Sequence, residues 1–119
     1  MNPVSIGVAG LGYWGPNIAR NLAQLPGVEL AWCCDASPEA RERWAASFPG
    51  ARFTADLDDL LSDDTLDAVV LATPVPTHGA LAERVLDAGK HCFVEKPLAQ
   101  SVEEAERAVA AALARRMGL

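Results

Sequence analysis

Short apolar segments alternate with helical segments along nearly the whole chain, and this alternation limits the possible folds more than any other feature. The apolar segments have the length and the β-branched composition of buried strands. The segments between them show helical spacing of apolar residues or begin at a capping residue. The expected strands are Val4–Ala9, Val28–Cys34, Arg52–Thr54, Ala68–Ala72 and His91–Glu95, and the expected helices are 14–25, 38–47, 57–61, 78–88 and 102–116.

This order of elements predicts an α/β fold. Strands that alternate with helices require right-handed crossovers, which place the strands in a parallel sheet with helices on both faces. We therefore expect one doubly wound, three-layer domain over residues 1–119 with strand order 3-2-1-4-5, the Rossmann-like arrangement. A chain of 119 residues is long enough to bury a core, since a domain of this size buries roughly two thirds of its unfolded surface.

Polar residues at the helix starts and apolar residues along the helices predict how each helix is anchored. Ser101 and Glu104 have the spacing of a capping box, and Thr77 stands where it can cap the fourth helix. Ser37 and Asp56 are the other expected caps. The apolar residues expected on one face of each helix are Ile18, Leu22 and Leu25 in 14–25, Leu81, Val85 and Leu86 in 78–88, and Val102, Ala105, Val109, Ala112 and Leu113 in 102–116.

Composition and charge limit the partners. The net charge of −6 comes without a stripe of lysine and arginine, so we expect no nucleic-acid partner. No apolar run approaches the ~20 residues of a membrane span. The first residues do not resemble a signal peptide, so we expect a cytoplasmic protein with no membrane partner. Cys33, Cys34 and Cys92 form no C-x-x-C pair, so we expect buried thiols and neither a metal site nor a disulfide.

The segment GVAGLGYWGPN, residues 7–17, places three glycines between the first strand and the first helix. Gly10, Gly12 and Gly15 have the G-x-G-x-x-G spacing of a dinucleotide-binding turn. In such a turn the first glycine permits the bend, the second lets the pyrophosphate approach the backbone, and the third lets helix and strand pack closely. The start of the helix then offers backbone N–H groups to the phosphates.

Asp35 follows the second strand, where a carboxylate can accept hydrogen bonds from the adenosine ribose. A carboxylate there repels a 2′-phosphate and favours NAD over NADP, although Arg41 in the next helix points the other way. A turn aspartate is an alternative interpretation of Asp35. A methyltransferase that binds an adenosyl group can also use a glycine-rich turn followed by an acid.

Two further segments follow the fourth and fifth strands and are expected to border the same crevice. Thr73, Pro74 and His78 follow the fourth strand, and Glu95 and Lys96 follow the fifth. A lysine beside a bound dinucleotide can orient a substrate hydroxyl and share its proton during hydride transfer. A solvated or Glu95-paired lysine, and a histidine with only a local hydrogen bond, are the alternatives.

The segments GVAGLGYWG, CCDASPEARE and ATPVPTHGALAERVLDAGKHCFVEKPLA, in this order, resemble the N-terminal domain of the Gfo/Idh/MocA oxidoreductases, the family of glucose-fructose oxidoreductase and inositol dehydrogenase. The resemblance implies that a dinucleotide binds at the turn and at Asp35. It also implies that the two later segments line its nicotinamide half, with Lys96 at the substrate. The cofactor-binding set implied by the resemblance is Gly10, Leu11, Gly12, Tyr13, Trp14, Gly15, Asp35, Thr73, Pro74, His78, Glu95 and Lys96.

The family continues into a sixth strand and a substrate domain, which we expect to be absent from residues 1–119. The expected function is the cofactor domain of an NAD-dependent oxidoreductase that acts on a CH–OH group of a sugar, sugar nucleotide or cyclitol. A stand-alone NAD-binding or regulatory module without catalysis is the alternative, with a homodimer through an exposed sheet edge or apolar patch.

Overall fold

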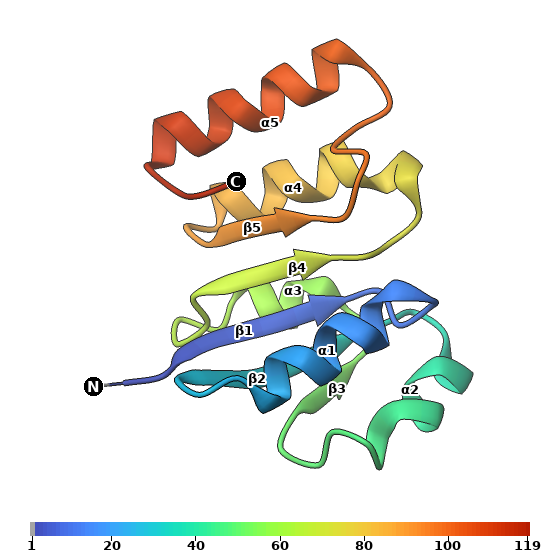
Figure 1. Ribbon diagram of the computed structural model, residues 1–119. Helices are drawn as coiled ribbons and strands as arrows, with labels where there is room; N and C mark the ends of the chain where they lie inside the picture. Colours follow the sequence, from blue (N-terminus) through green and yellow to red (C-terminus); the bar gives the residue numbers. More distant parts are fainter. Residues whose placement is uncertain (1) are drawn as a thin grey trace.

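Five parallel strands form one sheet in the computed structural model, which describes residues 2–119 (Figure 1). The strand order is β3-β2-β1-β4-β5, which confirms the doubly wound prediction. The strands are β1 (Val4–Ala9), β2 (Val28–Cys34), β3 (Arg52–Thr54), β4 (Ala68–Leu71) and β5 (His91–Val94). The helices are α1 (Trp14–Gln24), α2 (Pro38–Ala45), α3 (Leu57–Leu61), α4 (His78–Asp87) and α5 (Val102–Arg115), and the 3-10 turn η1 (Val75–Thr77) precedes α4.

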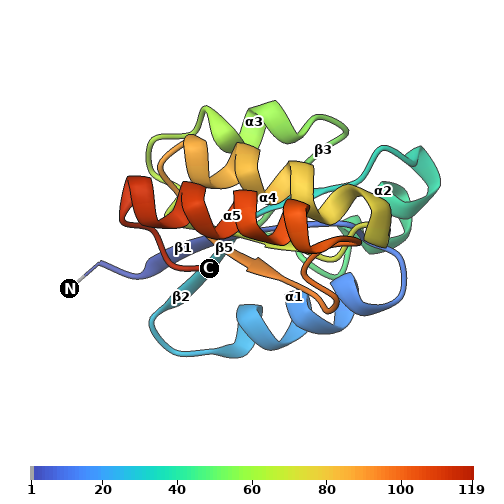
Figure 2. The same cartoon turned by 90° about the horizontal axis from the view of Figure 1, so that it is seen from above.

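The helices cover both faces of the sheet (Figure 2). Successive residues of β1 point to opposite faces, so Val8 packs with the α1 and α2 side and Ala9 with the side of α3, α4 and α5. Val8 is also in register with Cys33 of β2 and Val70 of β4, which places β1 at the centre of the core. The carboxyl ends of β1, β2, β4 and β5 therefore meet at one edge of the sheet.

Local capping signals set several helix starts. Ser37 Oγ accepts a hydrogen bond from Ala40 N–H, Asp56 Oδ1 from Asp58 N–H, and Ser101 Oγ from Glu104 N–H. These contacts confirm the predicted caps, because each side chain satisfies a backbone donor that the helix leaves free. None of the helices in residues 2–119 is long and apolar enough to cross a membrane.

Three predictions about helix caps and inner faces were wrong. Thr77 does not cap α4, because its hydroxyl donates to the Pro74 carbonyl oxygen instead (2.6 Å). Helix α5 buries Ala108 and Ala112 against α4, while Val102 and Leu113 are 69% and 75% exposed. Small residues allow the two helices to pack closely, and the described residues place no element over the larger apolar side chains. The same holds for Leu25 and Val109, which were also predicted on inner faces and are exposed.

Candidate functional site

The glycine turn between β1 and α1 is built by two close backbone approaches. Gly10 has φ +100°, and a Cβ at this position would lie 2.5 Å from the Ala72 carbonyl oxygen. A Cβ on Gly15 would lie 1.6 Å from the Gly10 carbonyl oxygen, so the first turn of α1 rests directly on the end of β1. At Gly12, in contrast, no heavy atom of the described residues lies within 4 Å of an added Cβ. The middle of the turn is therefore open to a ligand.

Asp35 is tied to this turn across the end of β2. Its Oδ2 accepts a hydrogen bond from Leu11 N–H (2.7 Å), and its Oδ1 accepts one from Ser37 N–H (2.8 Å). Each carboxylate oxygen keeps a further lone pair that can accept a hydroxyl hydrogen. Arg41 Nη1 lies on the other side and donates to the carbonyl oxygens of Asp35 and Ala36 (2.8 and 3.1 Å).

Two adjoining cavities lie along this edge of the sheet and share Gly10, Asp35, Thr73 and Pro74. One has a volume of about 370 Å³, and the other has a volume of about 420 Å³. The first is closed by small or apolar side chains from several elements, namely Ala36, Ala55, Leu57 and Leu81. The second is lined by the aromatic residues of the turn and by polar residues after β4 and β5, namely Tyr13, Trp14, His78, Glu95 and Lys96. Together they form one crevice with an apolar end and a polar end.

The loop after β4 is held by its own hydroxyl groups. Thr77 Oγ1 gives its single hydrogen to the Pro74 carbonyl oxygen, so Thr73 must be the donor in the 2.7 Å contact between the two threonine hydroxyls. The Thr73 hydroxyl oxygen therefore still has lone pairs that can accept a hydrogen bond from a ligand.

Lys96 follows β5 on the opposite side of the polar end, and its peptide bond to Pro97 is cis. The side chain is exposed, and its ammonium makes no hydrogen bond or ion pair within residues 2–119. It therefore has all three donors available to a ligand.

His78 has a different environment from the other polar residues of the crevice. Only 1% of it is exposed, and both ring nitrogens face backbone carbonyl oxygens: Nδ1 lies 2.7 Å from Pro97 O, and Nε2 lies 2.8 Å from Thr73 O. Its polar atoms are thus engaged within the protein, and only the remaining edge of the ring is left to border the crevice.

The structure brings most of the predicted binding residues together around this crevice. Leu11 and Gly15 are the exceptions, because Leu11 is buried in the core and Gly15 packs against Gly10. Sequence patterns missed the apolar end, since residues such as Ala55 and Leu57 carry no chemical signature. Their position directly after β3 is the signal that could have identified them.

The cysteine at this edge is not a reactive group. Burial, together with the carboxylates of Asp35, Asp56 and Asp59, raises the pKa of the Cys34 thiol to about 11, so it stays protonated at neutral pH. Cys33 and Cys92 are also buried free thiols. Residues 2–119 contain no group of three or more side chains placed to hold a metal ion.

Comparison with known proteins places the chain among dinucleotide-binding oxidoreductases. Residues 4–117 match the Gfo/Idh/MocA family, described as an oxidoreductase family with an NAD-binding Rossmann fold. Inositol 2-dehydrogenase 1 of Mycolicibacterium vanbaalenii is 38% identical over 104 residues, which are 87% of this chain and 30% of that protein.

Two solved structures resemble the model closely. GenD2 from gentamicin A biosynthesis, in complex with NAD, superposes with a TM-score of 0.92 and 38% identity over 98% of this chain and 33% of its own. The WlbA dehydrogenase of Bordetella pertussis, in complex with NADH and UDP-GlcNAcA, gives a TM-score of 0.90 and 35% identity over 98% of this chain and 36% of its own. The chain thus spans about a third of the length of these proteins.

Proposed function

Because the chain belongs to the Gfo/Idh/MocA family of oxidoreductases and has its NAD-binding Rossmann fold, we propose that the crevice at the carboxyl edge of the sheet is where the dinucleotide binds. The open approach at Gly12, directly beside the Asp35 carboxylate, is the observation that carries this assignment. The pyrophosphate lies over the turn, where the N–H groups and the dipole of α1 favour an anion. The adenosine ribose lies at Asp35, and the adenine fills the apolar end.

We propose that NAD is preferred over NADP. The Asp35 carboxylate repels a phosphate on the ribose 2′-oxygen. Arg41 could oppose this preference, but its guanidinium already donates to two backbone carbonyl oxygens at the end of β2. The charge nearest to the ribose hydroxyls is therefore negative.

The complete protein is proposed to oxidise or reduce a CH–OH group of a sugar, sugar nucleotide or cyclitol, with a substrate domain that lies outside these 119 residues. The inositol dehydrogenase and the sugar-nucleotide complex among the similar proteins support this substrate class. The nicotinamide supplies the hydride acceptor or donor when bound. Lys96, with three free donors at the polar end, orients the substrate oxygen and shares its proton.

The three buried thiols, with no disulfide among the described residues, suit a reducing compartment, and we propose a cytoplasmic location on that basis. Fractionation of cells that produce the protein tests this proposal directly.

Fluorescence titration with NADH tests the proposed site. Trp14 lines the polar end, so NADH should quench its emission and receive energy from it. Trp14→Phe should remove most of this signal, while Trp44→Phe, which changes a tryptophan on α2 outside the crevice, should retain it. NADPH should bind about tenfold more weakly or worse. Binding of S-adenosylmethionine without binding of NADH would overturn the proposal.

A further inference from the structure

The loops after β4 and β5 form two walls of the polar end, beside the glycine turn, and a single buried side chain joins them. The His78 ring contacts the carbonyl oxygen of Thr73, a residue of the loop that follows β4. It also reaches the carbonyl oxygen of Pro97, the residue after Lys96. The residue itself lies at the start of α4. Two loops that are separate in the sequence, the one after β4 and the one after β5, thus meet at one imidazole ring.

Hydrogen-bond donors decide what this contact requires. A neutral imidazole has one N–H, so it can satisfy only one of two carbonyl oxygens, and its other nitrogen then directs a lone pair at the second oxygen. Both contacts are favourable only when both ring nitrogens carry hydrogen. The distances of 2.7 and 2.8 Å are those of well-formed hydrogen bonds on both sides.

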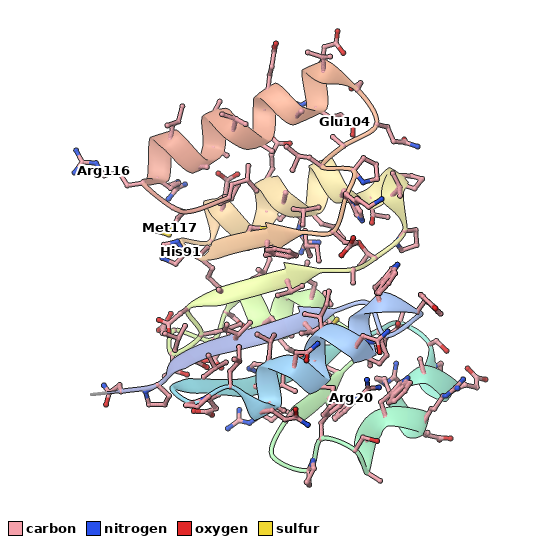
Figure 3. All side chains as sticks on the ribbon, in the orientation of Figure 1. Arg20, His91, Glu104, Arg116 and Met117 are labelled. Atoms are coloured by element: carbon pink, nitrogen blue, oxygen red, sulfur yellow. The ribbon has the colours of Figure 1, made fainter. Side chains whose placement is uncertain are left out.

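A buried carboxylate lies beside Gly79, the residue that follows His78. Glu104 Oε2 is buried and has no hydrogen-bond partner within residues 2–119. The same atom would lie 2.8 Å from a Cβ added at Gly79, the residue that follows His78. Figure 3 shows Glu104 on the first turn of α5, beside the start of α4.

We propose that His78 is a positioning residue that ties the two walls of the polar end together and thereby fixes Lys96 beside the nicotinamide half of the cofactor. The tie itself is a property of the folded chain, and its importance for Lys96 rests on the proposed function. In this role the ring is held through its two nitrogens between the two carbonyl oxygens and does not contact the cofactor through them.

Backbone dynamics of the 119-residue chain test this proposal. In the unchanged chain, Thr73, Lys96 and Leu98 should be as rigid as the strands, with 15N order parameters of about 0.85. In His78→Phe, which keeps an aromatic ring and loses both donors, the values at these three amides should fall below about 0.6. His78→Gln can donate to one carbonyl oxygen and should give intermediate values. His91→Phe is the matched control, because this ring lies beside Met117 at the start of β5 (Figure 3) and, within residues 2–119, makes its one hydrogen bond by accepting from Gly118 N–H.

Ring NMR of the unchanged chain gives a second, independent measurement if His78→Phe does not fold. The chain has two histidines, so His91→Phe assigns both rings. We expect ring N–H exchange in His78 to be at least about tenfold slower than in the exposed His91, because the His78 ring is buried and held by backbone carbonyl oxygens. Ring N–H exchange in His78 as fast as in His91 would overturn the tie.

Cofactor binding separates a failure of this inference from a failure of the proposed function. In His78→Phe the affinity for NAD+ should fall about fivefold, while the affinity for ADP-ribose, which lacks nicotinamide, should change by less than about twofold. Rigid loops in the folded variant, or an equal loss of both ligands, would overturn the positioning role. If the loops loosen but the unchanged chain binds neither ligand, the tie stands and the proposed function is wrong.

Discussion

The chain has two lysines, and they stand at opposite ends of the same strand with opposite environments. Lys90 precedes β5, is only 4% exposed, and donates from Nζ to the carbonyl oxygens of Asp63 and Leu66 (2.7 and 3.0 Å). Lys96 follows β5, is exposed, and has no intramolecular partner among the described residues. The first lysine holds a loop closed, whereas the second has all its donors free.

The two edges of the sheet differ in the same way. At the amino edge, Trp32 Nε1 donates to Asp63 Oδ2 (2.8 Å), and Thr65 donates to Asp63 Oδ1 from both its N–H and its hydroxyl. These polar groups stabilise one another within the protein. The carboxyl edge keeps unused capacity for a ligand. There is open space at Gly12, free lone pairs remain on the Asp35 and Thr73 oxygens, and the Lys96 ammonium has free donors. A binding site in this fold is recognised by polar groups whose hydrogen-bonding capacity the fold itself does not use.

Replacing the glycines of the turn should give the largest effect. Gly15→Ala places a Cβ 1.6 Å from a backbone oxygen and should destabilise the domain by about 3 kcal/mol or more. Gly12→Ala meets no heavy atom of the described residues, so the unfolding free energy should change by less than about 1 kcal/mol while NADH affinity falls about tenfold. Urea unfolding measures the free energy of unfolding, and NADH titration measures the affinity. Unchanged NADH binding by a folded Gly12→Ala would contradict the placement of the pyrophosphate.

Exchanging each lysine for methionine tests the comparison directly. Lys90→Met leaves two carbonyl oxygens without their donor, one of them in a buried contact, and should lower the unfolding free energy by about 2 kcal/mol. Lys96→Met should change it by less than about 0.5 kcal/mol. Urea unfolding of both variants provides the measurement. Equal losses in the two variants would mean that Lys96 has a structural partner in solution.

Asp35→Ala should have a smaller effect on stability and a clear effect on cofactor choice. The substitution removes the acceptor for Leu11 N–H and Ser37 N–H, which should cost about 1 kcal/mol in urea unfolding. It also removes the charge that repels a 2′-phosphate, so the ratio of NADH to NADPH affinity should fall toward one. If that ratio does not change, Asp35 is only a turn residue.

Substitution of Asp63 at the amino edge should have the smallest effect on stability, and this effect should appear only in acid. Hydrogen bonds from Thr65 and Trp32 lower the pKa of Asp63 from 3.8 to about 2. A pKa lowered by folding gives stability that is complete above about pH 4 and is lost as the pH falls toward 2. Asp63→Asn should therefore lose less stability than the unchanged chain between about pH 4 and 2 in urea unfolding. Asp64→Asn changes an exposed neighbouring position and should lose as much stability in acid as the unchanged chain. If Asp63→Asn also loses as much as the unchanged chain, the lowered pKa of Asp63 does not contribute to stability.

Local signals explain why so much of the fold could be predicted from the sequence. Strands such as Val28–Cys34 coincide with apolar runs, and caps such as Ser37 and Asp56 act on donors two or three residues away. Predictions failed where the sequence does not show which of several possible partners a side chain takes. The burial of Leu113 depends on what covers α5, and the hydroxyl of Thr77 prefers a loop carbonyl oxygen to the helix start.

The candidate site shows the same division between local and distant information. The glycine spacing and Asp35 were found because both occupy fixed positions after a strand. The contact of His78 with Pro97 spans 19 residues, and the apolar end of the crevice draws residues from the segments after β1, β2, β3 and β4, so neither has a sequence signature of its own. Such features follow only from the packing of the loops against one another.

The most direct test of the account is an amide NMR titration of the 119-residue chain with NADH. We expect large shift changes at Gly10, Gly12, Asp35, Thr73 and Lys96 along the carboxyl edge, with Trp32, Asp63 and Lys90 at the amino edge unchanged. The result that would contradict the account is saturable binding of NADH with the largest shift changes at the amino edge, or no shift change at the carboxyl edge at all.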